Sequence, residues 1–109
     1  MSNYLVVTTT VPNKTIAKQI AQLLLTRQLA ACVQIVGPME SHYWWENELQ
    51  QSEEYLCIAK TSKALYAQIE TLILENHPYV TPEVFATPIT QCTNQYQLWI
   101  DRYTATPVK

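Results

Sequence analysis

The sequence predicts a single α+β domain in which helices pack on an antiparallel sheet, and three observations indicate this fold class. Uncharged β-branched segments alternate along the chain with segments whose apolar residues recur at helical spacing. Residues 29–54 are typical of a long bent strand and most of its return partner, with no helix between them. The 109 residues, 48% of them apolar and 15% charged, suffice for one core. We expect one domain over residues 1–109, with its core at about 4–103 and a loose tail after Thr104.

The first strand is predicted at Tyr4–Val11, a β-branched run without charge that is typical of a central strand buried on both faces. Pro12 ends this run, and Asn13 is placed as the N-cap of a helix that extends to about Arg27. The helical spacing is carried by the apolar residues Ile16, Ala17, Ile20, Ala21 and Leu24.

A long hairpin follows the first helix. Leu29–Val36 is nearly all apolar, Gly37 with Pro38 can bend the strand, and Ser41–Trp45 brings three consecutive aromatic residues. A strand of about 14 residues spans about 45 Å, whereas a compact domain of this length has a radius of gyration near 13 Å. The hairpin is therefore predicted to project beyond its own domain, where another copy of the chain is the expected cover.

The hairpin turn is predicted at Glu46–Glu48, because Asn47 tolerates the left-handed backbone conformation that a tight turn requires. Glu53–Thr61 is the predicted return strand, and Ser62 is placed as the cap of a second helix. This helix is expected to end at His77, since the residue before a proline avoids helical angles.

The last two elements are a short strand and a helix. Glu83–Ile89 is β-prone and bracketed by prolines, which favours a sheet edge or a subunit contact. A final helix opens at Thr93 or Asn94. The order β, α, β, β, α, β with an added helix is the split βαβ arrangement of the ferredoxin-like fold, which by itself does not determine a function.

Charge and glycine content exclude several classes of function. The net charge is −2, and no Lys or Arg lies between Arg27 and Lys60, so the hairpin is acidic. An acidic hairpin indicates either a solvated strand face or a surface that attracts cations or a basic partner, and it disfavours nucleic acid. The single glycine excludes a phosphate-binding loop and argues against acylphosphatase-like chemistry.

Neither the histidines nor the cysteines form a catalytic pattern. His42 lies among aromatic residues in a strand and His77 at a helix end, so we expect no catalytic triad and no enzyme. The cysteines are odd in number and lack CxxC spacing, which favours free buried thiols at Cys32, Cys57 and Cys92. The sequence shows neither an export leader nor a long apolar run, so we expect a cytoplasmic protein without membrane contact.

The motif HPYxxPE, from His77 to Glu83, turns this general description into a specific resemblance. It occurs together with Leu29–Val33, Tyr43–Glu46, Ile58–Thr61 and Tyr96–Trp99. As a set, these segments resemble the CutA divalent-cation tolerance family over residues 4 to about 103. The resemblance implies a ferredoxin-like homotrimer, similar in architecture to the PII signalling proteins, with extended hairpins that bridge subunits.

The resemblance also implies a role in tolerance of divalent metals, notably copper. The family's proposed copper site consists of a cysteine after the first strand and two adjacent histidines before Pro-Tyr. Here Thr9 stands in the place of the cysteine, Asn76 replaces the first histidine, and His77 alone matches. We therefore expect no tightly bound cofactor and only weak binding of Cu²⁺, with His77 as the ligand.

The family pattern further implies clefts between subunits, with one cation, one carboxylate and aromatic walls. The cleft residues on this pattern are Cys32, Tyr43, Trp45, Lys60, His77, Tyr79 and Glu83. The preferred interpretation is a trimeric, non-enzymatic protein of metal-ion response. The alternative is a PII-like regulatory module that binds a small molecule or a protein partner in these clefts.

Overall fold

The computed structural model describes residues 3–105 as one four-stranded sheet with three α-helices and a single turn of 3₁₀ helix. The strands are β1 (Tyr4–Val11), β2 (Cys32–Trp45), β3 (Glu48–Ser62) and β4 (Val84–Pro88). The helices are α1 (Lys14–Thr26), the 3₁₀ turn η1 (Lys63–Leu65), α2 (Tyr66–Asn76) and α3 (Asn94–Tyr103). The last described residue, Ala105, donates its backbone N–H to the carbonyl of Gln28 at 2.7 Å. Residues 106–109 of the predicted tail lie outside the described part.

The strand order of the sheet is β2-β3-β1-β4, and all neighbouring strands are antiparallel. This order confirms the predicted ferredoxin-like α+β fold, with α3 as the additional helix. The short β4 lies at the edge of the sheet, as its flanking prolines indicated. Pro88, the last residue of β4, is tolerated there because an edge strand does not need every N–H for pairing.

The helix ends follow local hydrogen bonding. The Asn13 side chain accepts a hydrogen bond from the Ile16 amide at 2.9 Å, which confirms the predicted cap of α1. The predicted cap at Ser62 is wrong: its side chain makes no capping bond, and η1 intervenes before α2 begins at Tyr66. His77 ends α2 in an extended conformation before Pro78, as expected.

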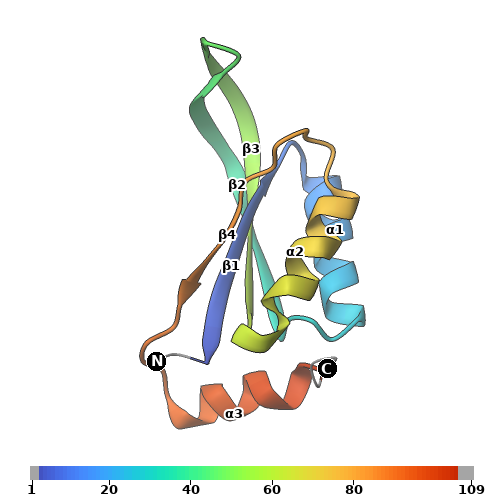
Figure 1. The fold of residues 1–109 in the computed structure, drawn as a ribbon, viewed down its shortest axis with the longest axis vertical. Helices are drawn as coiled ribbons and strands as arrows, with labels where there is room; N and C mark the ends of the chain where they lie inside the picture. The colour runs from blue at the N-terminus through green and yellow to red at the C-terminus, as the bar shows by residue number, and fades with distance from the viewer. Residues whose placement is uncertain (1–2, 106–109) are drawn as a thin grey trace.

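Helices α1 and α2 cover one face of the sheet (Figure 1). The core between them and the sheet contains side chains that are almost fully buried: Val7, Ile20, Leu24, Cys57, Ala59, Ile69 and Ile73. On the other face of β1, Val6 and Thr8 are only half-buried. The predicted burial of β1 on both faces therefore does not hold within a single chain. Helix α3 crosses the base of the sheet (Figure 1), where the Tyr4 hydroxyl donates to Asp101 at 2.7 Å.

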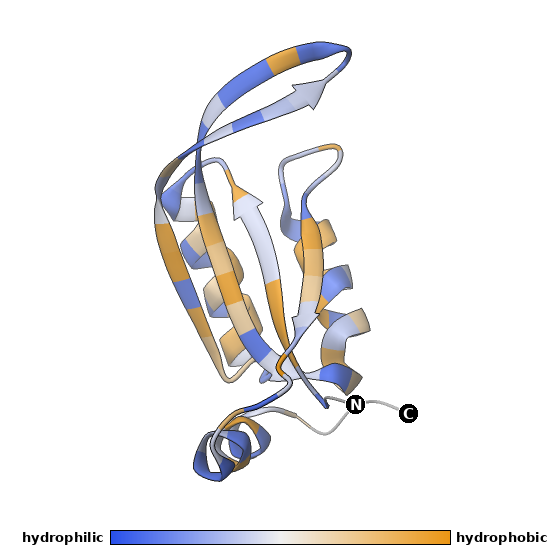
Figure 2. Ribbon diagram, turned by 90° about the vertical axis from the view of Figure 1, so that its left-hand side faces the viewer, coloured by the Kyte–Doolittle hydropathy of each residue, from blue (hydrophilic) through white to orange (hydrophobic). Residues whose placement is uncertain are grey.

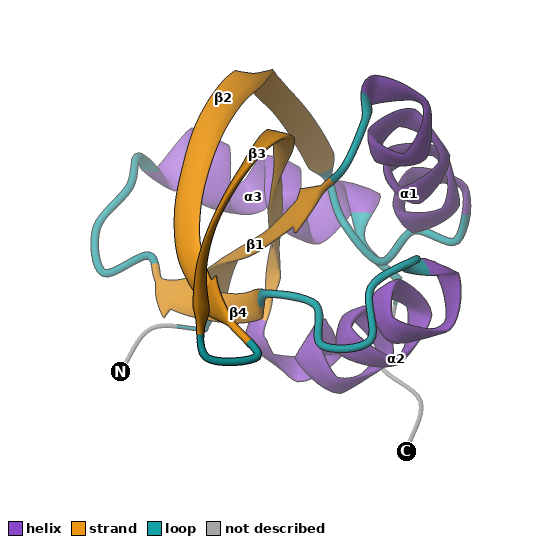
Figure 3. Cartoon of the chain, turned by 90° about the horizontal axis from the view of Figure 1, so that it is seen from above, coloured by secondary structure: helices purple, strands orange, loops and turns teal. Residues whose placement is uncertain are grey.

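Strands β2 and β3 continue well beyond the other strands as a curved two-stranded ribbon (Figures 1 and 3). The molecule measures 44 × 26 × 23 Å, as expected for a chain with an overhanging hairpin. The ribbon starts at a β-bulge between Val36 and Met39, where the pairing register shifts. Gly37 in this bulge has no room for a side chain, because a Cβ atom would lie 2.5 Å from the Tyr55 ring.

The tip of the hairpin is a two-residue turn at Glu46 and Asn47, which have φ values of 48° and 64°. The left-handed conformation predicted for Asn47 is confirmed, and Glu46 shares it because both positions of such a turn need positive φ. The return strand begins at Glu48, not at the predicted Glu53. The polar sequence of residues 48–52 masked this strand, since apolar and polar residues do not alternate there.

Candidate functional site

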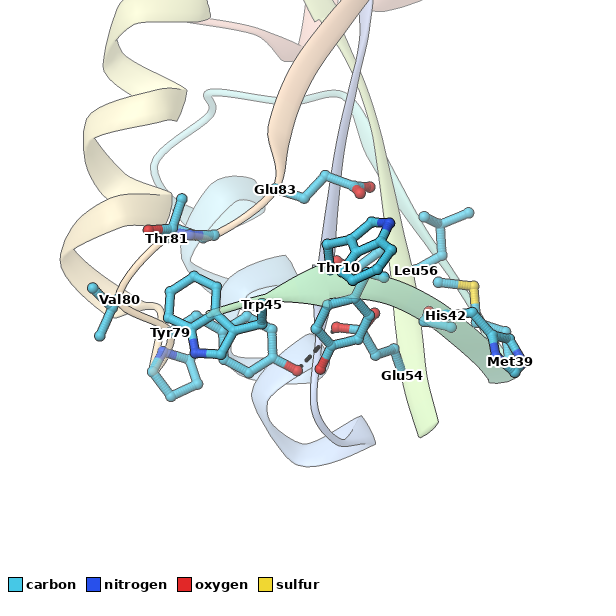
Figure 4. Close-up of a pocket in the computed structure, with 15 residues that line it drawn as sticks. Thr10, Met39, His42, Trp45, Glu54, Leu56, Tyr79, Val80, Thr81 and Glu83 are labelled. Carbon is cyan, nitrogen blue, oxygen red and sulfur yellow. Dashed lines mark hydrogen bonds between the residues drawn. The ribbon is translucent and has the colours of Figure 1, made fainter. Parts of the chain in front are cut away.

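A groove lies between the projecting part of the β2–β3 hairpin and the loop that joins α2 to β4. Its volume is about 830 Å³, which falls within the range of sites for small molecules. Four of the predicted cleft residues line it, namely Tyr43, Trp45, Tyr79 and Glu83. The last three are labelled in Figure 4. The chain therefore brings the aromatic motif of the hairpin and the HPYxxPE motif together on one site.

Strand β2 lines the groove with Tyr43, Trp44 and Trp45, and its pleat places two of these rings on one side. Residues that alternate along a strand share a face, so Tyr43 and Trp45 lie on the same side of the ribbon. The Tyr43 hydroxyl lies 3.2 Å from the Ser52 hydroxyl on the neighbouring strand, which fixes the phenol across the ribbon. Because the ribbon is otherwise uncovered, the two aromatic residues remain 41% and 42% exposed, respectively.

His77 anchors the loop that forms the opposite wall. Its Nε2 lies 2.7 Å from the backbone carbonyl of Thr10, and its Nδ1 accepts the backbone N–H of Tyr79 at 3.1 Å. A carbonyl can only accept, so Nε2 carries the proton and Nδ1 the lone pair. The imidazole thus ties the loop to β1 and orients Tyr79, whose ring centroid lies 4.7 Å from that of His77.

The hydrogen bonds of His77 determine whether its ring nitrogens are available to bind copper. Both ring nitrogens are already engaged, so a metal ion would have to displace the Tyr79 amide from Nδ1. Among residues 3–105, no three His, Cys, Asp or Glu side chains are gathered so that they could hold a metal ion. The other described histidine, His42, is exposed on the ribbon and pairs with Glu40 at 2.8 Å. Neither histidine has the partners of a preformed metal site.

Tyr79 and Glu54 are hydrogen-bonded neighbours in the lining of the groove (Figure 4). The Tyr79 hydroxyl donates to Glu54 Oε2 at 2.9 Å, and Glu54 is only 7% exposed. Burial raises the pKa of Tyr79 above its ordinary range, and the hydrogen bond to Glu54 and the charge of that carboxyl group raise it further. The phenol therefore stays protonated, and it holds the carboxylate in place.

Glu54 lines the groove, although the sequence analysis did not name it as a site residue. It belongs to the acidic hairpin, which was interpreted as either a solvated strand face or a surface that attracts cations or a basic partner. Its register explains its position: Glu54 lies opposite Met39, on the same side of the ribbon as Ser52 and therefore as Tyr43. The alternation of the hairpin, counted back from its turn, is the signal that could have found it.

Three predicted cleft residues, His77, Cys32 and Lys60, do not line the groove. Cys32 and Lys60 are cross-strand neighbours at the base of the sheet, and neither lines the groove. The Lys60 ammonium group donates to the Gln34 side chain on β2. Within a single chain, the predicted combination of one cation, one carboxylate and aromatic walls is therefore replaced by two carboxylates and aromatic walls.

The cysteines are free, as predicted, but they are not uniformly buried. Cys57 is buried in the core, Cys32 is half-buried and Cys92 is exposed. Burial raises the pKa of the Cys57 thiol to about 11, which makes it unreactive at neutral pH. The expectation of three buried thiols thus holds for Cys57 alone, because Cys92 lies in the loop before α3.

The fold and the groove define the chain as a ferredoxin-like α+β protein whose extended hairpin and α2–β4 loop enclose a groove of ligand size. A family model described as CutA1 divalent ion tolerance protein matches residues 5–103. The chain belongs to this family.

Individual relatives agree with this assignment. Protein CutA 1, chloroplastic, from rice (Oryza sativa subsp. japonica) is 41% identical over 92% of the chain and 56% of its own length. The chain thus spans little more than half of that relative. The divalent-cation tolerance protein CutA of Thermus thermophilus is 36% identical over 87% of the chain and 92% of its own length. The crystal structure of CutA1 from a Shewanella species superimposes with a TM-score of 0.93 at 39% identity, covering 96% of this chain and 98% of that one.

Proposed function

We propose that this chain acts in divalent-cation tolerance as a non-enzymatic binding protein, assembled as a homotrimer with ligand clefts at its hairpins. The observation that carries the proposal is the groove of about 830 Å³ between the hairpin and the α2–β4 loop. Membership of the divalent ion tolerance family supports the role, and relatives are named as tolerance proteins rather than after a reaction. A PII-like mode of action, in which a bound ligand changes contacts with a partner, fits a groove built on a protruding ribbon.

The proposed trimer rests on surfaces that the chain leaves uncovered. On the sheet face opposite α1 and α2, Val36 is 51% exposed and Phe85 is 45% exposed. Tyr43 and Trp45 are similarly exposed on the ribbon. Three copies that each pair with a neighbour close a ring, which buries Val36 and Phe85, brings Tyr43 and Trp45 to the subunit contact as walls of the cleft, and leaves no open strand edge.

The assembly is tested by light scattering at micromolar concentration, where the expected mass is three times the chain mass of 12.6 kDa. Trp45→Ala should weaken assembly, because a wide aromatic at a contact contributes more than its neighbours. Leu74→Ala is the matched control, since Leu74 is 49% exposed on α2, away from the hairpin. A monomeric wild type, or a Trp45→Ala protein as fully trimeric as the control, would contradict the proposal.

Weak binding of Cu²⁺ at His77 is the second candidate. The lone pair of Nδ1 is the available donor, and its hydrogen bond to the Tyr79 amide is the longer of the two that the ring makes. Displacing that amide costs about 0.5–1.5 kcal/mol, so the affinity stays low and folding does not depend on the metal. Calorimetry with Cu²⁺ on wild type and His77→Ala tests this. Equal binding by the two proteins, or no binding at millimolar metal, would reject it.

The cellular role requires a separate experiment. Cells that lack their own copy of the gene are challenged with Cu²⁺, Zn²⁺ and Cd²⁺ and given back the wild type or Trp45→Ala. We expect the wild type alone to restore growth.

We further infer a cytoplasmic location, which the three free thiols support. Among the described residues, no helix has the length and apolar character needed to span a membrane.

A further inference from the structure

The charge of the groove differs from that of an ordinary mixed pocket. Two carboxylates line it, Glu54 and Glu83, whereas no Lys or Arg is found among the residues that line it in the described chain. The sequence explains this, because it contains no Lys or Arg between Arg27 and Lys60, nor between Lys63 and Arg102. Within one chain, the groove therefore carries a negative potential that attracts cations.

The walls of the groove are aromatic. Tyr43 and Trp45 come from the hairpin and Tyr79 from the α2–β4 loop, so aromatic rings face the space from both sides. Tyr43 and Tyr79, from these two elements, both line the groove. The negative faces of aromatic rings attract cations, and most strongly those that give up their hydration readily.

A metal ion is a poor match for this combination. Metal ions need several oxygen, nitrogen or sulfur donors at short distance, and the part of the chain described by the structure gathers no such group of three. One oxygen of Glu54 is already engaged by the Tyr79 hydroxyl. An alkylated ammonium ion, in contrast, needs no inner coordination shell and gains from both the carboxylates and the ring faces.

We propose that the groove binds a small organic ammonium ion with alkyl groups on its nitrogen, held between the rings of Tyr43, Trp45 and Tyr79 and neutralised by Glu54 and Glu83. This inference rests on the proposed role of the groove as a ligand cleft and names the class of its ligand. The volume of about 830 Å³ accommodates an ion of the size of choline together with water.

The test compares choline with its uncharged isostere 3,3-dimethylbutan-1-ol, in which carbon replaces the nitrogen. Binding to the full chain in its native assembly is followed by tryptophan fluorescence and by calorimetry. We expect saturable binding of choline, at least tenfold tighter than that of the isostere, and weaker at high salt. Equal binding of the two compounds, or no saturable binding of choline, would overturn the inference.

Variants locate the binding. Glu54→Gln keeps an oxygen that accepts the Tyr79 hydroxyl, and Glu83→Gln alters an exposed side chain, so both changes preserve the fold. Each should weaken choline binding about tenfold, the loss expected for removing one charged partner. Glu53→Gln is the matched control, because Glu53 neighbours Glu54 but pairs with Glu40 on the other face of the ribbon. If Glu53→Gln binds choline as weakly as the two groove variants do, the loss of affinity comes from the overall charge, and the inference is overturned.

Failure here is distinguishable from failure of the proposed function. The mass of the assembly and the growth of challenged cells do not depend on the class of ligand. A trimeric, tolerance-restoring protein that does not distinguish choline from its isostere rejects only the ligand class. A monomer that fails to restore growth rejects the proposed function as well.

Discussion

Strands β2 and β3 each have one half within the sheet and one half in the projecting ribbon. The side chains of the two halves differ strongly in exposure. In the half that pairs with β1, alternate side chains of β3, such as Cys57 and Ala59, are at most 2% exposed beneath the helices. In the projecting half, Trp44 and Leu49 are each 69% exposed. Figure 2 shows the same contrast as hydrophobic residues low on these strands and mostly hydrophilic residues toward the tip. One pair of strands thus forms part of the core at one end and lines the groove at the other, and the buried end holds the exposed end in place.

The largest expected effect separates these halves by stability. Leu24→Ala removes a side chain that is 1% exposed under the sheet and should lower the free energy of unfolding by about 2–5 kcal/mol. Leu49→Ala at the tip should change it by no more than about 0.5 kcal/mol. Urea denaturation at one fixed protein concentration measures both. Similar losses from the two substitutions would show that the ribbon is part of the folding core.

The boundary between the halves lies at Gly37, and Gly37→Ala tests it. The added Cβ would lie 2.5 Å from the Tyr55 ring and 3.1 Å from the Glu54 carbonyl, so the bulge has to shift. We expect a loss of about 1–3 kcal/mol in the free energy of unfolding. Leu74→Ala is the control, since this side chain is 49% exposed on α2. If the two variants unfold at the same urea concentration, the close packing at the bulge is not a constraint.

A third prediction uses the buried thiol of the core half. Folding raises the pKa of Cys57 from 9.0 to about 11, so the folded chain retains the proton more strongly than the unfolded chain. The resulting stability is present below about pH 9 and is lost as the pH rises toward 11. Between pH 8 and 10.5, the wild type should lose about 2 kcal/mol more than Cys57→Ala. The exposed Cys92 gives the control, because Cys92→Ala should leave the wild-type pH profile unchanged.

The smallest effect concerns the tip of the projecting half. Asn47 has φ of 64°, a conformation that costs most L residues about 1–2 kcal/mol. Asn47→Ala should therefore lower the melting temperature by a few degrees, corresponding to about 1 kcal/mol. Asn47→Gly should match or exceed the wild type, since glycine adopts positive φ freely. An alanine variant that melts with the wild type would mean that the tip relaxes into another turn.

Sequence reasoning succeeded for the core half because burial leaves a periodic signature. The β-branched run of β1, the apolar stripe of α1 and the cap at Asn13 each follow from one local rule. Gly37 also predicted the bend, since a lone glycine in a strand marks a bulge. The start of α2 was misplaced because the choice between a 3₁₀ turn and an α-helix after Ser62 depends on tertiary packing around the fully buried Leu65.

The projecting half was harder to predict, because its residues face other residues distant in sequence. Tyr43, Trp45, Tyr79 and Glu83 were identified through family motifs and do meet in one groove. Lys60 and Cys32 belong to the same motifs, but pair at the base of the sheet, where no local rule separates them from the groove residues. Glu54 was hidden in an acidic run, and only the register that pairs it with Met39 reveals its position.

The two-residue turn at Glu46 and Asn47 also limits how the reach of the ribbon can change. Antiparallel pairs alternate between hydrogen-bonded and non-hydrogen-bonded types, and the turn closes on the pair formed by Trp45 and Glu48. Removing one residue from each strand would present the other type of pair to the turn. The same turn fits again only after two residues are removed from each strand. The ribbon can therefore be shortened or lengthened in steps of roughly 7 Å, a discrete scale on which the reach of the hairpin beyond the sheet can be set.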